Sequence, residues 1–171
     1  SNPESAAPIG NLLTANTAYD VDVVGPFAYV GAGDLEIIDI SNPAAPSLVS
    51  RLFTPGDPCE VKVVPGPSQA PGDEEESYAY VADGPGGLQI VDVTDPHAPR
   101  IVAGVAPQSG AAGLAIDGDF AYVADSFAGL KVVDVSDRTA PTILGQVDTY
   151  RARGVAVRDT DPTAQGQRGR G

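Results

Sequence analysis

The chain alternates short apolar runs with turns, and one order of runs returns three times. An apolar run that ends in aspartate occurs at residues 35–39, 88–92 and 130–134, as LEIID, LQIVD and LKVVD. Short runs rich in Val, Ile and Tyr, bounded by Gly, Pro, Asn and Asp, are typical of β-strands. No stretch has helical periodicity. The pattern therefore predicts an all-β fold made of a repeated unit.

Each unit predicts four short strands. In the third unit the expected strands lie at 113–116, 120–125, 130–135 and 143–147. Tyr122 lies 42 residues after Tyr80, but Tyr80 lies 51 after Tyr29, mainly because of an insert at 65–77 rich in Pro, Gly and acid. We expect this insert to be an exposed loop. Four strands in such a unit are typical of a β-propeller blade, and the LQIVD-type strand is expected to lie buried between neighbouring blades.

The register of the units divides the chain into three full blades and two partial ones. The full blades are expected at 18–54, 59–105 and 112–149. Residues 1–14 are expected to end a preceding blade, with an outer strand at 9–14. Residues 150–158 are expected to begin a further blade with a strand at 154–157, and 159–171 to form a polar loop or tail.

Three full blades make an incomplete propeller, because closed propellers have four to eight. Three explanations remain open. The chain is a fragment of a longer propeller, or two chains pair into one ring, or the two terminal strands combine into a fourth blade. Because the sequence contains no methionine, we also expect Ser1 not to be a natural start.

The repeated sequence resembles a known protein family. YVADGPGGLQIVDVTDPHAP, YVADSFAGLKVVDVSDRTAP and LEIIDISNPAAP are similar to LVIVD repeats, β-propeller repeats of bacterial and archaeal proteins that are often exported. The resemblance covers residues 1–158. It departs at 31–33, where Gly-Ala-Gly replaces the Ala-Asp of the other units, and at Arg138, where Pro43 and Pro96 stand in the others. It implies a propeller fold and a secreted or cell-surface location.

Composition narrows the range of partners. The chain has 10 Lys and Arg against 23 Asp and Glu, a net charge of −13, which argues against a nucleic-acid partner. No apolar run is long enough to span a membrane. Cys59 and His97 are each the only residue of their type, so the sequence predicts neither a disulfide framework nor a His-based zinc site.

The repeated aspartates allow two interpretations. Asp39, Asp92 and Asp134 end the named strand, and Asp83 and Asp125 follow Val-Ala. They are either metal ligands around a channel or structural acceptors for backbone N–H groups in turns and between blades. Recurrence in equivalent places favours the structural role, since a ligand site usually breaks the symmetry of a repeat.

Residues that break the symmetry are the better candidates for a ligand site at the channel mouth, a common place in propellers by analogy of fold. The candidates are Tyr19, Cys59, Glu60, Asp83, Asp125, Phe127 and Arg153. Ca²⁺ is the one cofactor candidate, because carboxylate-rich loops suit it. Its weak candidates are the pairs Asp117 with Asp119 and Asp159 with Asp161, and neither pair continues into an EF-hand.

No catalytic motif is recognisable in the sequence. We therefore expect a non-enzymatic, extracellular or cell-surface propeller that binds a protein or glycan, or further blades or copies of itself. One alternative is a metal-binding or enzymatic propeller with its site at the channel mouth or in missing blades. Another is a structural unit that assembles with copies of itself.

Overall fold

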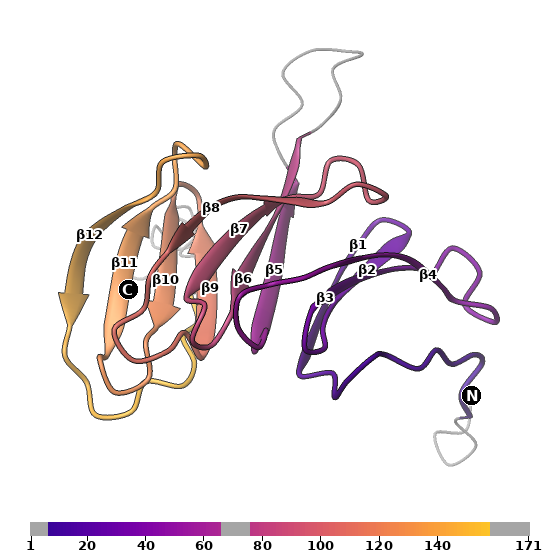
Figure 1. The fold of residues 1–171 in the computed structure, drawn as a ribbon, viewed down its shortest axis with the longest axis horizontal. Helices are drawn as coiled ribbons and strands as arrows, with labels where there is room; N and C mark the ends of the chain where they lie inside the picture. Colours follow the sequence, from indigo (N-terminus) through magenta and orange to yellow (C-terminus); the bar gives the residue numbers. More distant parts are fainter. Residues whose placement is uncertain (1–6, 66–75, 158–171) are drawn as a thin grey trace, which may run out of the picture.

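The structure, a computed structural model, describes residues 7–65 and 76–157 and contains β-strands without helices in these ranges. Twelve strands form three antiparallel sheets, each of four strands consecutive in sequence, which lie side by side in chain order (Figure 1). The first blade holds β1 (Asp20–Val24), β2 (Phe27–Gly31), β3 (Leu35–Asp39) and β4 (Ser47–Leu52). The second holds β5 (Glu60–Pro65), β6 (Ser77–Ala82), β7 (Leu88–Asp92) and β8 (Arg100–Val105). The third holds β9 (Gly113–Asp117), β10 (Phe120–Ala124), β11 (Leu130–Asp134) and β12 (Thr142–Val147). The predicted all-β fold with four-stranded blades is confirmed.

The three blades share one register. The LQIVD-type run forms the third strand of each, β3, β7 and β11, between the second and fourth strands. The pairing of third and fourth strands shifts at the same place in every blade, between Ile37 and Ile38 in the first. Sequence repeats are therefore structural repeats down to single residues, and positions can be compared between blades.

The hydrophobic core lies between the blades. One cluster joins Tyr29, Leu35 and Ile37 of the first blade to Val61 and Val91 of the second. A second cluster joins the second and third blades in the same manner. Each blade is thus a two-faced sheet that buries apolar side chains against the next. The first strands meet at the centre, because β1 lies against β5 and β5 against β9.

The two terminal strands predicted from the sequence do not form. Residues 9–14 and 154–157 are in no strand and no sheet, so the fourth blade built from both is also absent. A strand needs a neighbour to satisfy its backbone groups, and neither segment has one in the described chain. Their positions nevertheless follow the repeat. Gly10 lies against Pro43 and Ala44, much as β4 reaches the next blade where the Ser50 hydroxyl donates to the Pro96 carbonyl at 2.6 Å.

The loop predicted at 65–77 is shorter at both edges than expected, since Pro65 ends β5, Ser77 begins β6 and the two residues pair. Residues 66–75 lie outside the described ranges, as do residues 158–171.

Candidate functional site

Carboxylates on the first strands join neighbouring blades at the centre. Asp20 and Asp22 accept the Val61 and Val63 N–H groups of β5 at 2.9 and 2.7 Å. Glu60 accepts the Leu114 N–H of β9 at 2.9 Å. These amides belong to the free inner edges of β5 and β9, so the carboxylates cap an edge that would otherwise be open.

Lys62 balances these charges, since its Nζ lies 3.5 Å from both Asp20 and Glu60 and donates to the Val61 carbonyl. Glu60, a ligand candidate from the sequence, is therefore occupied in holding the second blade to the third.

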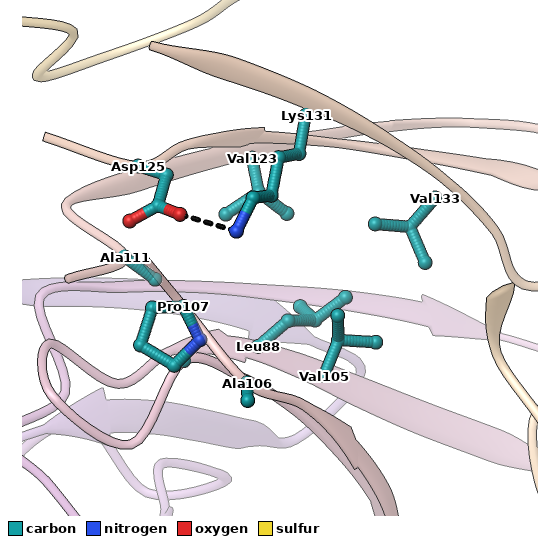
Figure 2. Close-up of a pocket in the computed structure, with 10 residues that line it drawn as sticks. Leu88, Val105, Ala106, Pro107, Ala111, Val123, Asp125, Lys131 and Val133 are labelled. Atoms are coloured by element: carbon teal, nitrogen blue, oxygen red, sulfur yellow. Dashed lines mark ion pairs between the residues drawn. The ribbon is translucent and has the colours of Figure 1, made fainter. Parts of the chain in front are cut away.

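Asp125 is a ligand candidate that the structure buries completely. Its carboxylate accepts the N–H groups of Gln108, Ser109 and Gly110 at 2.7 to 2.9 Å, and Lys131 Nζ lies 2.6 Å away (Figure 2). Burial alone raises the pKa of Asp125, but the hydrogen bonds from these amides and from Lys131 outweigh it and lower that pKa below its ordinary value.

A cavity of about 10 Å³ separates this ion pair from the apolar side chains of the second blade. Figure 2 shows Leu88 and Val105 opposite Lys131. The volume is close to the least that one water molecule needs. The site therefore fixes residues 106–112, the linker from β8 of the second blade to β9 of the third. It leaves no room for a larger ligand.

Asp83 occupies the same position in the second blade without a cation. Gln89 stands where the third blade has Lys131, and its amide donates to the Gly86 carbonyl. Asp83 Oδ2 accepts only the Gly56 N–H, at 2.8 Å. Its Oδ1 and the Thr54 hydroxyl are buried without a hydrogen-bond partner in the described structure. Burial raises the pKa of Asp83, the nearby Thr54 hydroxyl and the Gly56 N–H oppose this only in part, and the charges of Asp57 and Asp34 raise it further.

In the first blade the buried carboxylate lies on the third strand and not after the second strand. Ala32 stands in the place of Asp83 and Asp125, while Glu36 stands in the place of Gln89 and Lys131. Glu36 is buried, accepts the Ala15 N–H at 3.0 Å and pairs with Arg51 at 2.7 Å. Ala15 precedes β1 as Gln108 precedes β9, so the same linker amide finds a carboxylate in both blades.

The aspartates that end the third strands are also structural. Asp39, Asp92 and Asp134 accept the N–H groups of Ser41, Thr94 and Ser136 at 2.8 to 3.0 Å. Each holds the turn that follows its own strand. The hydrogen bonds from the turn residues lower the pKa of Asp39 and Asp134. The structural interpretation of the repeated aspartates is confirmed by these contacts.

The remaining candidates for a ligand site lie in two separate places. Tyr19 is exposed before β1, and the Cys59 thiol lies 3.3 Å from the Asp57 carbonyl, half-buried. Burial and the charges of Asp57 and Asp83 raise the pKa of the Cys59 thiol, which makes it a poor nucleophile. Arg153 forms no ion pair with Glu60, although the Glu60 carboxylate and the Arg153 carbonyl both lie close to Gly113.

Phe127 and Arg153, by contrast, are brought together. They line a hollow of about 170 Å³ with Ser126, Arg151 and Ala152, which we call the arginine hollow. The Arg151 guanidinium lies over the Phe127 ring, 5.3 Å from its centroid. Ser126 and Arg151 were not predicted. The sequence did contain a signal for Arg151. When the segments between blades are aligned as well as the strands, Arg151 stands where the preceding blade has Gly110.

Of the four calcium candidates, only Asp117 and Asp119 lie in the part of the chain that the structure describes. Asp117 and Asp119 flank the β9–β10 turn, and Asp159 and Asp161 lie outside the described ranges. Across residues 7–65 and 76–157, no group of three or more His, Cys, Asp or Glu side chains is arranged to hold a metal ion. Nor does any helix in these ranges have the length and apolar character to cross a membrane.

Three four-stranded sheets whose first strands meet at the centre, with the core between sheets, define a β-propeller-type repeat fold. A family model described as the LVIVD repeat matches residues 15–54, 75–106 and 109–149. The chain therefore belongs to the LVIVD repeat family.

Comparison with solved structures supports the fold alone. The crystal structure of the computationally designed Ika4 protein is similar over 91% of this chain and 88% of that one, with a TM-score of 0.60 and 13% sequence identity. No curated protein sequence matches the chain.

Proposed function

We propose that the chain is a non-enzymatic binding module of an exported propeller and that its contact surface includes the arginine hollow. The observation that carries the proposal is the separation of roles among polar side chains. Asp20, Asp22, Glu60 and Lys62 join the blades at the centre, and Asp125 holds a linker. In the arginine hollow, the Arg151 and Arg153 side chains have no carboxylate partner among the described residues, while the Ser126 hydroxyl donates to the Gly110 carbonyl at 2.7 Å.

An extracellular or cell-surface location is part of this proposal. Its support is the resemblance to repeats that are often exported and a net charge of −13, which favours solubility and keeps molecules apart. Protease treatment of intact cells of the source organism tests it. Digestion of the protein before lysis is expected, and full protection until lysis would contradict the location.

Binding is tested by retention of the chain on an immobilised panel of extracellular proteins and polysaccharides. Phe127 is 64% exposed and Phe120 is 40% exposed at the opposite end of β10. Phe127→Ala is expected to abolish retention and the matched control Phe120→Ala to preserve it. Equal retention of wild type and Phe127→Ala would show that the hollow is not part of the contact surface.

A second candidate is self-assembly through the outer strand of the third blade. Val102 and Val105 of β8 pack into the core between the second and third blades. Their counterparts in β12, Leu144 and Val147, are 57% and 60% exposed. This face continues the interface that joins the blades, and a second copy of the chain offers blades of matching kind.

Sedimentation velocity over a wide range of concentration tests self-assembly. The wild type is expected to form dimers or larger species, and Leu144→Glu to remain monomeric. Ile143→Glu is the control, because Leu48 and Ile101 at the same position are exposed in the other blades as well. A wild type that stays monomeric throughout would eliminate this candidate.

A further inference from the structure

We infer that the arginine hollow is a binding site for an oxyanion, a carboxylate or phosphate group borne on a small ligand. The inference rests on the proposed function, since it names the ligand class of the same surface. Its basis is the charge, the symmetry and the backbone conformation of the residues that line the hollow.

The two arginines are cations without an assigned anion in a strongly acidic chain. Arg151 and Arg153 form no ion pair with any described residue, although the chain carries a net charge of −13. Among the other Lys and Arg side chains of the described ranges, Arg138 also has no carboxylate partner and lies over the Tyr78 ring, as Arg151 lies over the Phe127 and Tyr150 rings. The rest have carboxylate partners, namely Arg51 with Glu36, Lys62 with Asp20 and Glu60, Arg100 with Asp92, and Lys131 with Asp125. The Arg151 guanidinium at this hollow, with Arg153 also in the lining, is an arrangement that suits an external anion.

Comparison between blades shows that the hollow is an addition to the repeat. Isolated β-bridges join Gly84 to Ala111 and Ser126 to Ala152, which fixes the equivalence of these positions. The same place between the second and third blades is therefore formed by Gly84, Pro85, Gly110, Ala111 and Ala112. These residues have no polar side chain, whereas the hollow has Arg151 for Gly110 and Arg153 for Ala112, and Ser126 for Gly84 with its hydroxyl bound to the Gly110 carbonyl.

The backbone of the hollow is strained by this addition. Arg151 has φ +63° and Ser126 has φ +43°, while their counterparts Gly110 and Gly84 have φ +130° and +49°. Positive φ is easily adopted by glycine and unfavourable for other residues. An arginine placed where the repeat has glycine thus costs folding free energy, and strain of this kind is typical of functional positions.

The composition of the hollow indicates the ligand. A guanidinium binds carboxylate or phosphate oxygens through paired hydrogen bonds. The exposed Phe127 ring lines the hollow, and Tyr150, which is 87% exposed, has its ring centroid 5.8 Å from the Arg151 guanidinium, so both rings offer apolar contact to the rest of the ligand. A long polyanion is disfavoured because the net charge of the chain repels it at a distance. A single oxyanion on a small ring or chain fits both the size and the charge.

Isothermal titration calorimetry of the full chain tests the inference with three probes: sodium phosphate, sodium D-glucuronate and D-glucose. Saturable binding is expected for phosphate or glucuronate, which separates the two oxyanions, and none is expected for glucose. Absence of saturable binding of both anions up to about 10 mM, a weak affinity on any scale, would overturn the inference.

Two variants make the test specific. Arg151→Gly restores the residue of the repeat, so it is expected to have a melting temperature at or above that of the wild type. It is also expected to weaken anion binding by at least about tenfold, the effect of one lost charge-assisted hydrogen bond. Arg100→Ala removes the same charge at the start of β8, where Arg100 pairs with Asp92, and is expected to bind the anion as the wild type does. Equal binding by Arg151→Gly would contradict the assignment.

The two proposals fail separately. If the panel component is retained through Phe127 while neither anion binds, the oxyanion site is wrong and the binding module stands. If the anions bind through Arg151 while no panel component is retained, the oxyanion site stands and the proposal that the module binds a protein or polysaccharide is wrong.

Discussion

Lys131 Nζ lies 2.6 Å from Asp125 Oδ2, and both side chains are buried. The same two positions hold Asp83 with Gln89 in the second blade and Ala32 with Glu36 in the first. Three blades of one backbone register thus satisfy the linker amides with three different charge arrangements. The second arrangement is the only one of the three in which the carboxyl group has no cationic partner among the described residues.

Lys131→Met is expected to lower the free energy of unfolding by about 3–5 kcal/mol, because it leaves the Asp125 carboxylate buried with only backbone donors. Chemical denaturation at pH 7 measures the change. Lys131→Gln reproduces the arrangement of the second blade and is expected to cost less. The double variant Asp125→Asn/Lys131→Met should recover part of the loss, and equal stability of Lys131→Met and wild type would refute the structural role of the pair.

Gln89→Lys is expected to raise the free energy of unfolding at pH 7 by about 1–3 kcal/mol, since it gives the Asp83 carboxylate a charge-assisted hydrogen bond. Denaturant titration of both proteins provides the measurement. In an Asp83→Asn background the same substitution should give no gain, and a gain of equal size there would show that Asp83 is not involved.

The pH dependence of that gain has a defined sign. The folded pKa of Asp83 is raised above its unfolded value, so its ionisation opposes folding as pH rises from the unfolded pKa through the folded one. Below the unfolded pKa the penalty is absent from the wild type, so the lysine has no penalty left to relieve there. The stabilisation by Gln89→Lys should therefore decrease as pH falls toward about 4, and a gain independent of pH would contradict the raised pKa.

Asp22→Ala is expected to lower the free energy of unfolding by about 1–3 kcal/mol, because it leaves the Val63 N–H of β5 without its acceptor. Hydrogen exchange at the Val63 amide should become faster, while exchange in the third blade is unchanged. Asp22→Asn keeps an oxygen acceptor and is expected to lose less. Unchanged exchange at Val63 in Asp22→Ala would mean that the carboxylate does not join the blades.

The strands were predictable because their pattern is repeated. The LQIVD-type run recurs with the same neighbours, so its place as a buried third strand followed from the sequence. The buried polar residues at its second position, Glu36, Gln89 and Lys131, were not recognised as a set, since they differ in charge. Their common role appears only when the linker amides that face them are placed in space.

The site was predictable in part. Phe127 and Arg153 were two of seven residues expected at the channel mouth, and they line one hollow. Glu60 and Asp125 were expected at the same mouth, but hydrogen bonds to the next blade or to the linker occupy their carboxylates. Sequence position alone cannot show whether a carboxylate points to solvent or to a neighbouring backbone. Arg151 was missed because the linker that carries it was not compared with Gly110.

The most direct test of the proposed binding module is backbone hydrogen exchange of the chain with and without the panel component that it retains best. Added protection is expected at residues 126–127 and 150–154, with exchange in β1, β5 and β9 unchanged. Protection centred on the first strands, or no protected segment at the hollow, would contradict it.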